Sequence, residues 1–227
     1  MRLDLLDAYN IRARLSPSII LLGPIAFTIF LCFESVYTFT SSTILICILL
    51  AFTNYIPILQ RHIRAKKPSP INYAAQFLEM NDSTIDSVSK KRYYQKLATI
   101  NESFSLFRTP SNTPEFKNCC KSAVLYLRNQ TRNQHLVLEE NINYGFCKNM
   151  MASRPIGITI CLFMSLLTVG YSLSLSPTLY ENPMSNWVAL IANLLLLLFW
   201  LFGINKKMLE EASRRYAFTL ISAIDTL

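Results

Sequence analysis

Four long stretches without a single charged residue constrain this chain more than any other feature of its sequence. They cover residues 15–33, 35–60, 155–180 and 182–205, and they contain 19, 26, 26 and 24 residues. An α-helix rises about 1.5 Å per residue, so roughly 20 residues cross the hydrocarbon core of a bilayer. The pattern therefore predicts an all-α membrane protein with four transmembrane helices, arranged as two hairpins.

The positive charges all lie on one side of these stretches. Of the 22 Lys and Arg residues, three precede the first stretch, fifteen lie between the second and the third, and four follow the fourth. The two short connections hold no basic residue, and each carries one acid, Glu34 or Glu181. Because basic residues are retained on the cytoplasmic side, we expect a multi-pass membrane protein with both termini in the cytoplasm.

The same boundaries divide the chain into five parts. Residues 1–14 are predicted to form an interfacial amphipathic helix, and residues 15–60 and 155–205 are predicted to form transmembrane hairpins. Residues 61–154 are expected to be a basic, mainly helical cytoplasmic domain, and residues 206–227 to continue the fourth span as a cytoplasmic helix. The 61–154 segment carries 15 basic and 7 acidic residues. Its charge suits the anionic inner leaflet, a nucleic acid or an acidic protein, and leaves these alternatives open.

Two helix starts are marked within the cytoplasmic segment. Thr113, Pro114 and Glu115 supply an N-cap residue, a proline at the first helical position and an acid in the first turn. Ser83 and Asp86 have the spacing of a capping box, which predicts a helix that begins directly after Ser83.

The sequence holds no pattern typical of an enzyme. Glu139 and Glu140 are adjacent, so on a helix they point about 100° apart and do not converge on one substrate atom. The six cysteines and two histidines lack the spacing of a zinc or redox site. We therefore expect a protein without catalytic activity, cofactor or metal.

A polar cluster lies directly before the third stretch, in the sequence EENINYGFCKNMMASRPIG of residues 139–157. We interpret it as a joint that couples the cytoplasmic segment to the membrane, in which Gly145 permits a bend. We expect Glu140 to be clamped by Arg128 or Arg132. A purely structural helix join is the alternative. The residues of this coupling joint are Arg128, Arg132, Glu139, Glu140, Asn141, Tyr144, Gly145, Phe146, Lys148 and Asn149.

Two further sets of residues follow from the membrane interpretation. Aromatic and basic residues near the ends of the stretches are candidates for the membrane interface. They are Tyr9, Arg12, Arg14, Pro17, Trp187 and Trp200. Uncharged polar residues inside the stretches are candidates for helix packing or for lining a pore. They are Asn54, Ser165, Thr168 and Asn193.

The chain resembles a family of small bacterial multi-span membrane proteins. Three patterns carry the resemblance: Y-x-x-R-x-R-L-x-P before the first span, L-R-x-x-T-R in the cytoplasmic segment, and E-N-x-x-Y-G-F-x-[RK]-N before the third span. The matching positions are Tyr9, Arg12, Arg14, Leu15 and Pro17; then Leu127, Arg128, Thr131 and Arg132; then Glu140, Asn141, Tyr144, Gly145, Phe146, Lys148 and Asn149. The chain departs from the family around residues 68–82, where a Trp-Gly-Gly-Pro-like turn is missing, and at Cys147, where an Arg is common.

The resemblance implies a function. Such genes occur among bacterial anti-phage defence genes, including retron-like systems with membrane effectors. It implies an inner-membrane effector that forms pores or depolarises the membrane in abortive infection, acting as a homo-oligomer in the lipid bilayer. The implied partner is a cytoplasmic sensor, such as a reverse transcriptase with its RNA or DNA, and direct nucleic-acid binding is left open. The alternative is a non-conducting membrane scaffold or regulatory subunit.

Overall fold

Helices account for the regular structure of the residues that the computed structural model describes, namely 8–32, 62, 71–175 and 183–227. The chain divides into two units. The apolar unit comprises the described residues up to 62 together with 145–208, and the polar unit comprises the described residues from 71 to 144 together with 209–227. Two helices, α6 and α8, contribute residues to both units.

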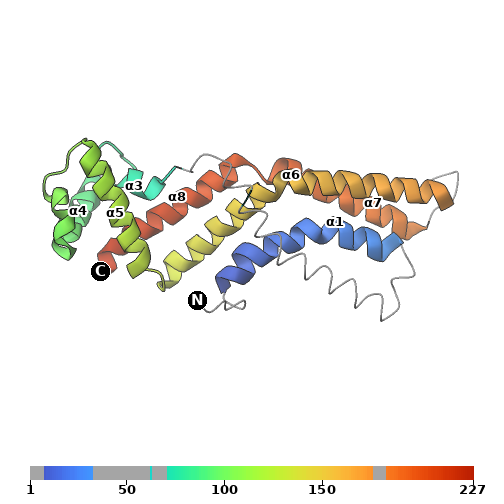
Figure 1. Cartoon of the computed structure of the whole chain (residues 1–227), viewed down its shortest axis with the longest axis horizontal. Coiled ribbons are helices and arrows are strands. Elements are labelled where there is room, and N and C mark those ends of the chain that lie inside the picture. The colour runs from blue at the N-terminus through green and yellow to red at the C-terminus, as the bar shows by residue number, and fades with distance from the viewer. Residues whose placement is uncertain (1–7, 33–61, 63–70, 176–182) are drawn as a thin grey trace. The chain divides into compact units, whose positions relative to one another are not determined.

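Three helices are long and apolar enough to cross a membrane, and they account for three of the four predicted spans. The first covers Asn10–Cys32 and consists of a π-helical segment, Asn10–Leu15, followed by α1, Ser16–Cys32. The second is α6, His135–Leu175. The third covers Met184–Gly203, in which α7, Met184–Leu198, passes into a π-helical segment, Phe199–Gly203. Figure 1 shows α1, α7 and the apolar part of α6 side by side. The predicted second span, residues 35–60, lies outside the described residues.

The polar unit is built from short helices around an aromatic core. Its elements are α3, Tyr73–Phe77; α4, Ser87–Ile100; a 3-10 helix, Glu102–Arg108; α5, Pro114–Gln130; and a terminal 3-10 helix, Ala223–Thr226. Residues from the start of α6 and from α8, Lys206–Ser222, complete it. The Tyr94 and Phe107 rings pack against each other and both contact Phe116, with centroids 5.3–5.9 Å apart. Burial of such rings is a major stabilising contribution to a small core.

One predicted helix start is confirmed and the other is displaced. The Thr113 side chain accepts a hydrogen bond from the backbone N–H of Phe116, and Pro114 begins α5. The N-cap of α4, in contrast, is Asp86, whose carboxylate accepts from the N–H of Ser89 at 2.8 Å. Asp82 accepts from the N–H of Thr84 and closes a turn there. The predicted start after Ser83 was therefore wrong: α4 begins three residues later, at Ser87, because the residues after Asp82 form this turn.

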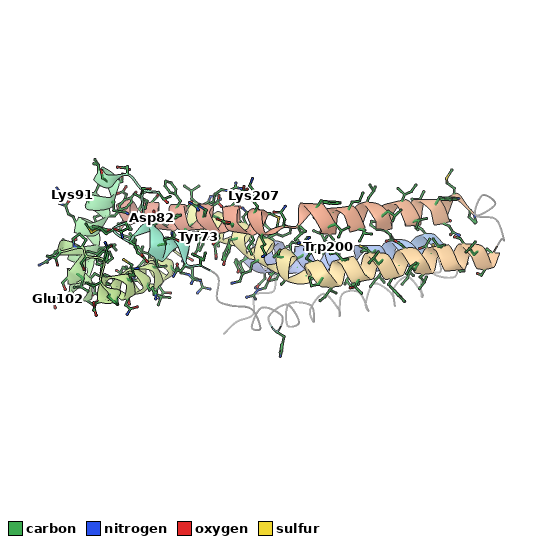
Figure 2. All side chains as sticks on the ribbon, turned by 90° about the horizontal axis from the view of Figure 1, so that it is seen from above. Tyr73, Asp82, Lys91, Glu102, Trp200 and Lys207 are labelled. Atoms are coloured by element: carbon green, nitrogen blue, oxygen red, sulfur yellow. The ribbon has the colours of Figure 1, made fainter. Side chains whose placement is uncertain are left out.

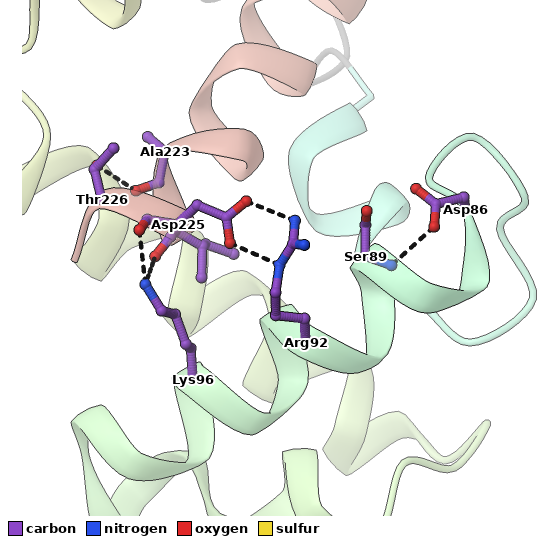
Figure 3. A network of polar contacts seen from close by, with 8 residues as sticks. Asp86, Ser89, Arg92, Lys96, Ala223, Asp225 and Thr226 are labelled. Atoms are coloured by element: carbon purple, nitrogen blue, oxygen red, sulfur yellow. Dashed lines mark hydrogen bonds and ion pairs between the residues drawn. The ribbon is translucent and has the colours of Figure 1, made fainter.

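The terminal 3-10 helix, Ala223–Thr226, is held against α4 in the polar unit (Figure 3). The Arg92 guanidinium donates from Nε and Nη2 to the two carboxylate oxygens of Asp225, at 2.9 and 2.7 Å. Lys96 donates from Nζ to the backbone carbonyls of Ile224 and Asp225. The bonds from Lys96 satisfy carbonyls that a helix end leaves without intrahelical partners.

The apolar helix Met184–Gly203 does not continue directly into the C-terminal helix. Ile204 adopts an extended backbone conformation, and α8 begins at Lys206. The Asn205 side chain accepts from the N–H of Met208 at 2.9 Å and donates to the carbonyl of Phe202. The predicted continuous helix is thus interrupted, since Asn205 both ends one helix and caps the next.

Candidate functional site

The N-terminal segment packs closely on α6 within the apolar unit. Gly145 faces it: an added Cβ would lie 2.9 Å from the Tyr9 hydroxyl and 3.1 Å from the Ala13 Cβ. One turn later, the Asn149 amide donates to the backbone carbonyl of Ala13. Ala13 and Asn149 are buried, at 0% and 4% exposure. Two sequence patterns separated by more than a hundred residues therefore meet here, where small residues let two helices approach closely.

Gly145 itself lies within α6, which runs without interruption from His135 to Leu175. Its φ angle is not positive. The expected bend is replaced by a packing role, because the missing side chain makes room for the ring of Tyr9 and for Ala13. The helix also passes through Pro155, whose carbonyl accepts from the Thr159 hydroxyl at 3.0 Å.

A second close approach lies two turns further along α6. The guanidinium of Arg154 donates from Nε to the carbonyl of Trp200 at 3.2 Å and from Nη2 to that of Leu201 at 2.9 Å. The Trp200 ring fills the space over Gly157, where an added Cβ would lie 2.5 Å from its Cδ2. Arg154 thereby satisfies carbonyls at the end of the third described span.

Trp200 lies among the helices of the apolar unit (Figure 2) and is fully buried. It was expected at the membrane interface, but its ring packs on Gly157 and not on a lipid-facing surface. Trp187, near the start of α7, keeps 36% of its surface exposed, and its interfacial role stays a prediction. An aromatic residue near the end of an apolar stretch can be an interfacial anchor or a buried packing residue. Which of the two it is depends on whether a neighbouring helix covers its ring.

The N-terminal interface candidates divide into exposed and buried residues. Arg12 and Arg14 are exposed, whereas Pro17 is buried. Arg14 donates to the Asn10 side chain at 2.9 Å, and its guanidinium lies 5.5 Å from the centre of the Tyr9 ring. The exposed arginines suit anionic headgroups, whereas Pro17 contributes to packing.

The expected clamp on Glu140 is not formed among the described residues. No hydrogen bond or ion pair there joins Glu140 to Arg128 or Arg132, and both arginines are exposed. Glu140 is partly buried, and its Oε2 atom is buried without a hydrogen-bond partner in the described part of the chain. Opposite charges in the same region of the sequence do not by themselves turn the two side chains towards each other.

The remaining residues of the predicted joint fall into the two units. In the polar unit, the Tyr144 ring stacks on that of Tyr216, with centroids 5.8 Å apart and planes 5° apart. In the apolar unit, Phe146 packs against the buried cluster that contains Met150 and Trp200. Glu139, Asn141 and Lys148 are partly buried residues of α6.

The polar residues of the spans face one another inside the apolar unit. Asn193 on α7 donates from Nδ2 to the hydroxyl of Thr28 on α1 at 2.7 Å. Asn186 donates in the same way to the hydroxyl of Ser172 on α6 at 3.1 Å. Thr168 donates to the carbonyl of Met164 in its own helix. Ser165 is also buried, and Asn54 lies outside the described residues.

Sequence reasoning missed several of these residues. A row of small or polar residues, at spacings of four and three, runs along the buried face of α6. They are Asn149, Ser153, Gly157, Cys161, Ser165, Thr168 and Ser172. This regular spacing is visible in the sequence and could have indicated the packed face of α6. The partners Thr28 and Asn186 lie on other helices and carry no comparable signal.

The polar unit also buries one lysine. Lys90 is 7% exposed and donates from Nζ to the backbone carbonyls of Glu79 and Asp82. Burial lowers the pKa of Lys90 and raises the pKa of the neighbouring Cys120 thiol to about 12. The Tyr94 hydroxyl donates to the Leu78 carbonyl, and burial raises its pKa as well. A buried ammonium bonded to two carbonyls ties the turn after α3 to α4, which is a structural role.

Comparisons of the chain with protein-family models, with curated proteins and with solved structures find no match. The site geometry and the sequence patterns therefore carry the functional argument.

Proposed function

We propose that the chain is a non-enzymatic effector of a bacterial anti-phage defence system. In this proposal it resides in the inner membrane with both termini in the cytoplasm, and it permeabilises or depolarises that membrane when a cytoplasmic sensor signals infection. The defence setting rests on the resemblance described above. The lipid bilayer, further copies of the chain and a sensor such as a reverse transcriptase with its nucleic acid are the proposed partners.

One structural observation carries the coupling part of the proposal. Helix α6 is a single helix of 41 residues that begins in the polar unit and supplies an apolar stretch long enough to cross a membrane. Residues 135–144 directly precede the packed face that begins at Gly145 in the same helix. This covalent continuity is the proposed route by which a signal in the polar unit reaches the apolar unit.

The contacts of that face are suited to respond to a displacement of α6. Gly145 and Gly157 each meet a bulky ring at a distance that leaves no spare room. A shift or rotation of α6 would have to break the fit against Tyr9 and Trp200 together with the bond from Asn149 to Ala13. Packed interfaces of this kind change between discrete arrangements more readily than they deform gradually.

A second candidate function is favoured by the cross-helix bonds. Asn193 to Thr28 and Asn186 to Ser172 are bonds of the kind that hold transmembrane helices together. If packing is their only role, the chain is a non-conducting scaffold or regulatory subunit that recruits a partner of its basic segment to the membrane.

Expression of the full chain in bacterial cells, with a potential-sensitive dye as readout, tests the proposal. When it is overproduced without the sensor that holds it inactive, the parent protein is expected to depolarise the membrane and arrest growth. Glu140→Gln and Gly145→Val are expected to reach the membrane in normal amounts but to depolarise less. Gln removes the charge of a partly buried side chain, and Val crowds Tyr9 and Ala13. Abundance in the membrane fraction reports insertion for every variant.

Matched substitutions serve as controls. Glu115→Gln changes an exposed acid on α5. Gly170→Val adds a side chain where no atom of the described residues lies within 4 Å of the new Cβ. Both variants are expected to act like the parent. A parent that inserts without any depolarisation would favour the scaffold, whereas joint variants that depolarise like the parent would reduce the cluster to a helix join.

A further inference from the structure

Six buried polar side chains from all three described spans share the interior of the apolar unit. We call this set the polar column, and its members are Thr28, Ser165, Thr168, Ser172, Asn186 and Asn193. Each is at most 8% exposed. None is charged, so burial in an apolar medium costs far less than it would for an ionised group.

The column extends along the helix axes and is not confined to one level. Asn186 and Asn193 are seven residues apart on α7, as are Ser165 and Ser172 on α6, which corresponds to roughly 10 Å. The Asn186 amide bonds to Ser172 on α6, and the Asn193 amide bonds to Thr28 on α1.

Two atoms of the column are not satisfied by these bonds. The Asn193 Oδ1 and Ser165 Oγ atoms are buried and have no hydrogen-bond partner among the described residues, and Asn193 is 0% exposed. An unpaired polar atom in a hydrocarbon environment costs several kcal/mol in general. Helix packing alone would be served better by an apolar side chain, so the unpaired oxygens indicate a second role.

The outer faces of the same helices are apolar. Leu166, Leu173 and Leu195 are 72%, 49% and 61% exposed. The helices thus present hydrocarbon side chains outward and amide or hydroxyl groups inward. Such an arrangement lets helices separate around water while their outer faces stay in lipid.

We propose that the polar column is the path along which water and small monovalent cations cross the membrane when the protein is active. This inference rests on the proposed function and names the conducting part of it. Amide and hydroxyl oxygens can replace the hydration shell of a cation, and neutral groups bind it weakly enough to release it. In the structure the bonds from Asn193 to Thr28 and from Asn186 to Ser172 hold the path closed.

Substitutions inside and outside the column test the path. Asn193→Leu and Thr28→Val replace its polar groups, and Thr159→Val makes the same change on the exposed side of α6. Each full-length variant is expressed, and potassium efflux is measured and divided by membrane abundance. Because apolar constrictions expel water, we expect efflux to fall at least roughly tenfold for the first two variants and to stay at the parent level for Thr159→Val.

Cys161 supplies a second readout that does not depend on conduction. It lies on the same buried face of α6 and is 0% exposed. A charged methanethiosulfonate reagent reacts with a thiol that water reaches and spares one packed in a dry interior. Mass spectrometry of the labelled protein is expected to find Cys161 modified in the active parent and unmodified in Asn193→Leu.

The outcomes separate the inference from the function on which it rests. One outcome is that the parent conducts, that all three variants conduct equally and that Cys161 stays unmodified. The column is then only a packing element, and the proposed function stands. If the parent does not conduct and Cys161 stays unmodified, both fail. Labelling of Cys161 without any potassium efflux would show a hydrated column and overturn its assignment as a cation path.

Discussion

At the scale of single residues, two glycines of α6 illustrate how a side chain can be excluded by its neighbours. Gly145 meets the hydroxyl end of Tyr9, whereas Gly157 meets the middle of a buried indole ring. The hydroxyl end of a tyrosine can move by a small rotation. The Trp200 ring is fully enclosed and has no such freedom. Equal chemical changes at the two positions should therefore have unequal effects.

We expect Gly157→Ala to destabilise the protein more than Gly145→Ala. Overpacking a well-filled interior typically costs about 1–3 kcal/mol. Gly170→Ala is the control, since no described residue crowds that position, and alanine there gains helix propensity. Thermal unfolding of the detergent-solubilised variants gives the order. Equal melting temperatures for Gly157→Ala and Gly170→Ala would contradict the assigned contact with Trp200.

Residue burial also predicts an alkaline instability of the polar unit. The Cys120 thiol has a pKa raised to about 12 by burial, whereas its ordinary value is 9.0. Below pH 9 the thiol is protonated in both states, and the stabilisation is complete. Between pH 9 and about 12 the unfolded chain releases the proton more readily than the folded protein does, so the free energy of unfolding falls.

Cys120→Ala should therefore lose less stability than the parent when the pH rises from 8 to 11. Urea unfolding followed by near-ultraviolet circular dichroism measures this difference. Cys119→Ala is the matched control, because burial also raises the pKa of its neighbour Cys119 but to a smaller extent. If the parent and Cys120→Ala lost stability in parallel, the thiol would not be the titrating group.

At the scale of elements, the ends of helices depend on which side chain reaches the free N–H groups. Ser83 and Asp86 both suit the N-cap of α4, and the turn formed around Asp82 leaves Asp86 as the cap. The hydrogen bond from the N–H of Ser89 lowers the pKa of Asp86. The carboxylate therefore serves the helix best when it is ionised.

Asp86→Ala should lower the melting temperature by a few degrees, as loss of an N-cap typically does. Ser83→Ala should leave it unchanged, since Ser83 lies in the preceding turn. Differential scanning calorimetry of both variants distinguishes them. A larger decrease in melting temperature for Ser83→Ala than for Asp86→Ala would indicate that the helix begins directly after Ser83, as the sequence pattern predicted.

At the scale of the whole molecule, the one-sided distribution of basic residues predicts the orientation in the membrane. We expect residues 1–14, 61–154 and 206–227 in the cytoplasm. Alkaline phosphatase fused after Leu227 should be inactive, because that enzyme folds only where disulfides form, and a fluorescent-protein fusion there should be bright. An active phosphatase at this end would refute the predicted topology.

How much could be predicted from the sequence depended on whether the signal was local. The three described spans and the start of α5 follow from apolar runs and from a cap, which neighbouring residues define. The interruption at Ile204 was missed, although Asn205 supplied a local signal for it. The ion pair of Glu140 with Arg128 or Arg132 was predicted from the position and the charges of the cluster. It is not formed among the described residues, because opposite charges in one region do not fix where each side chain points.

By itself the sequence determined that this chain has long apolar helices and a basic segment between them, because hydrophobicity and charge are properties of each stretch alone. Only the tertiary structure decided that Trp200 is buried over Gly157, that Gly145 receives Tyr9 and that Asn193 reaches Thr28. Each of these contacts joins residues more than forty positions apart. Their formation depends on how whole helices pack, and a local pattern carries no information about which distant side chain fills the space beside it.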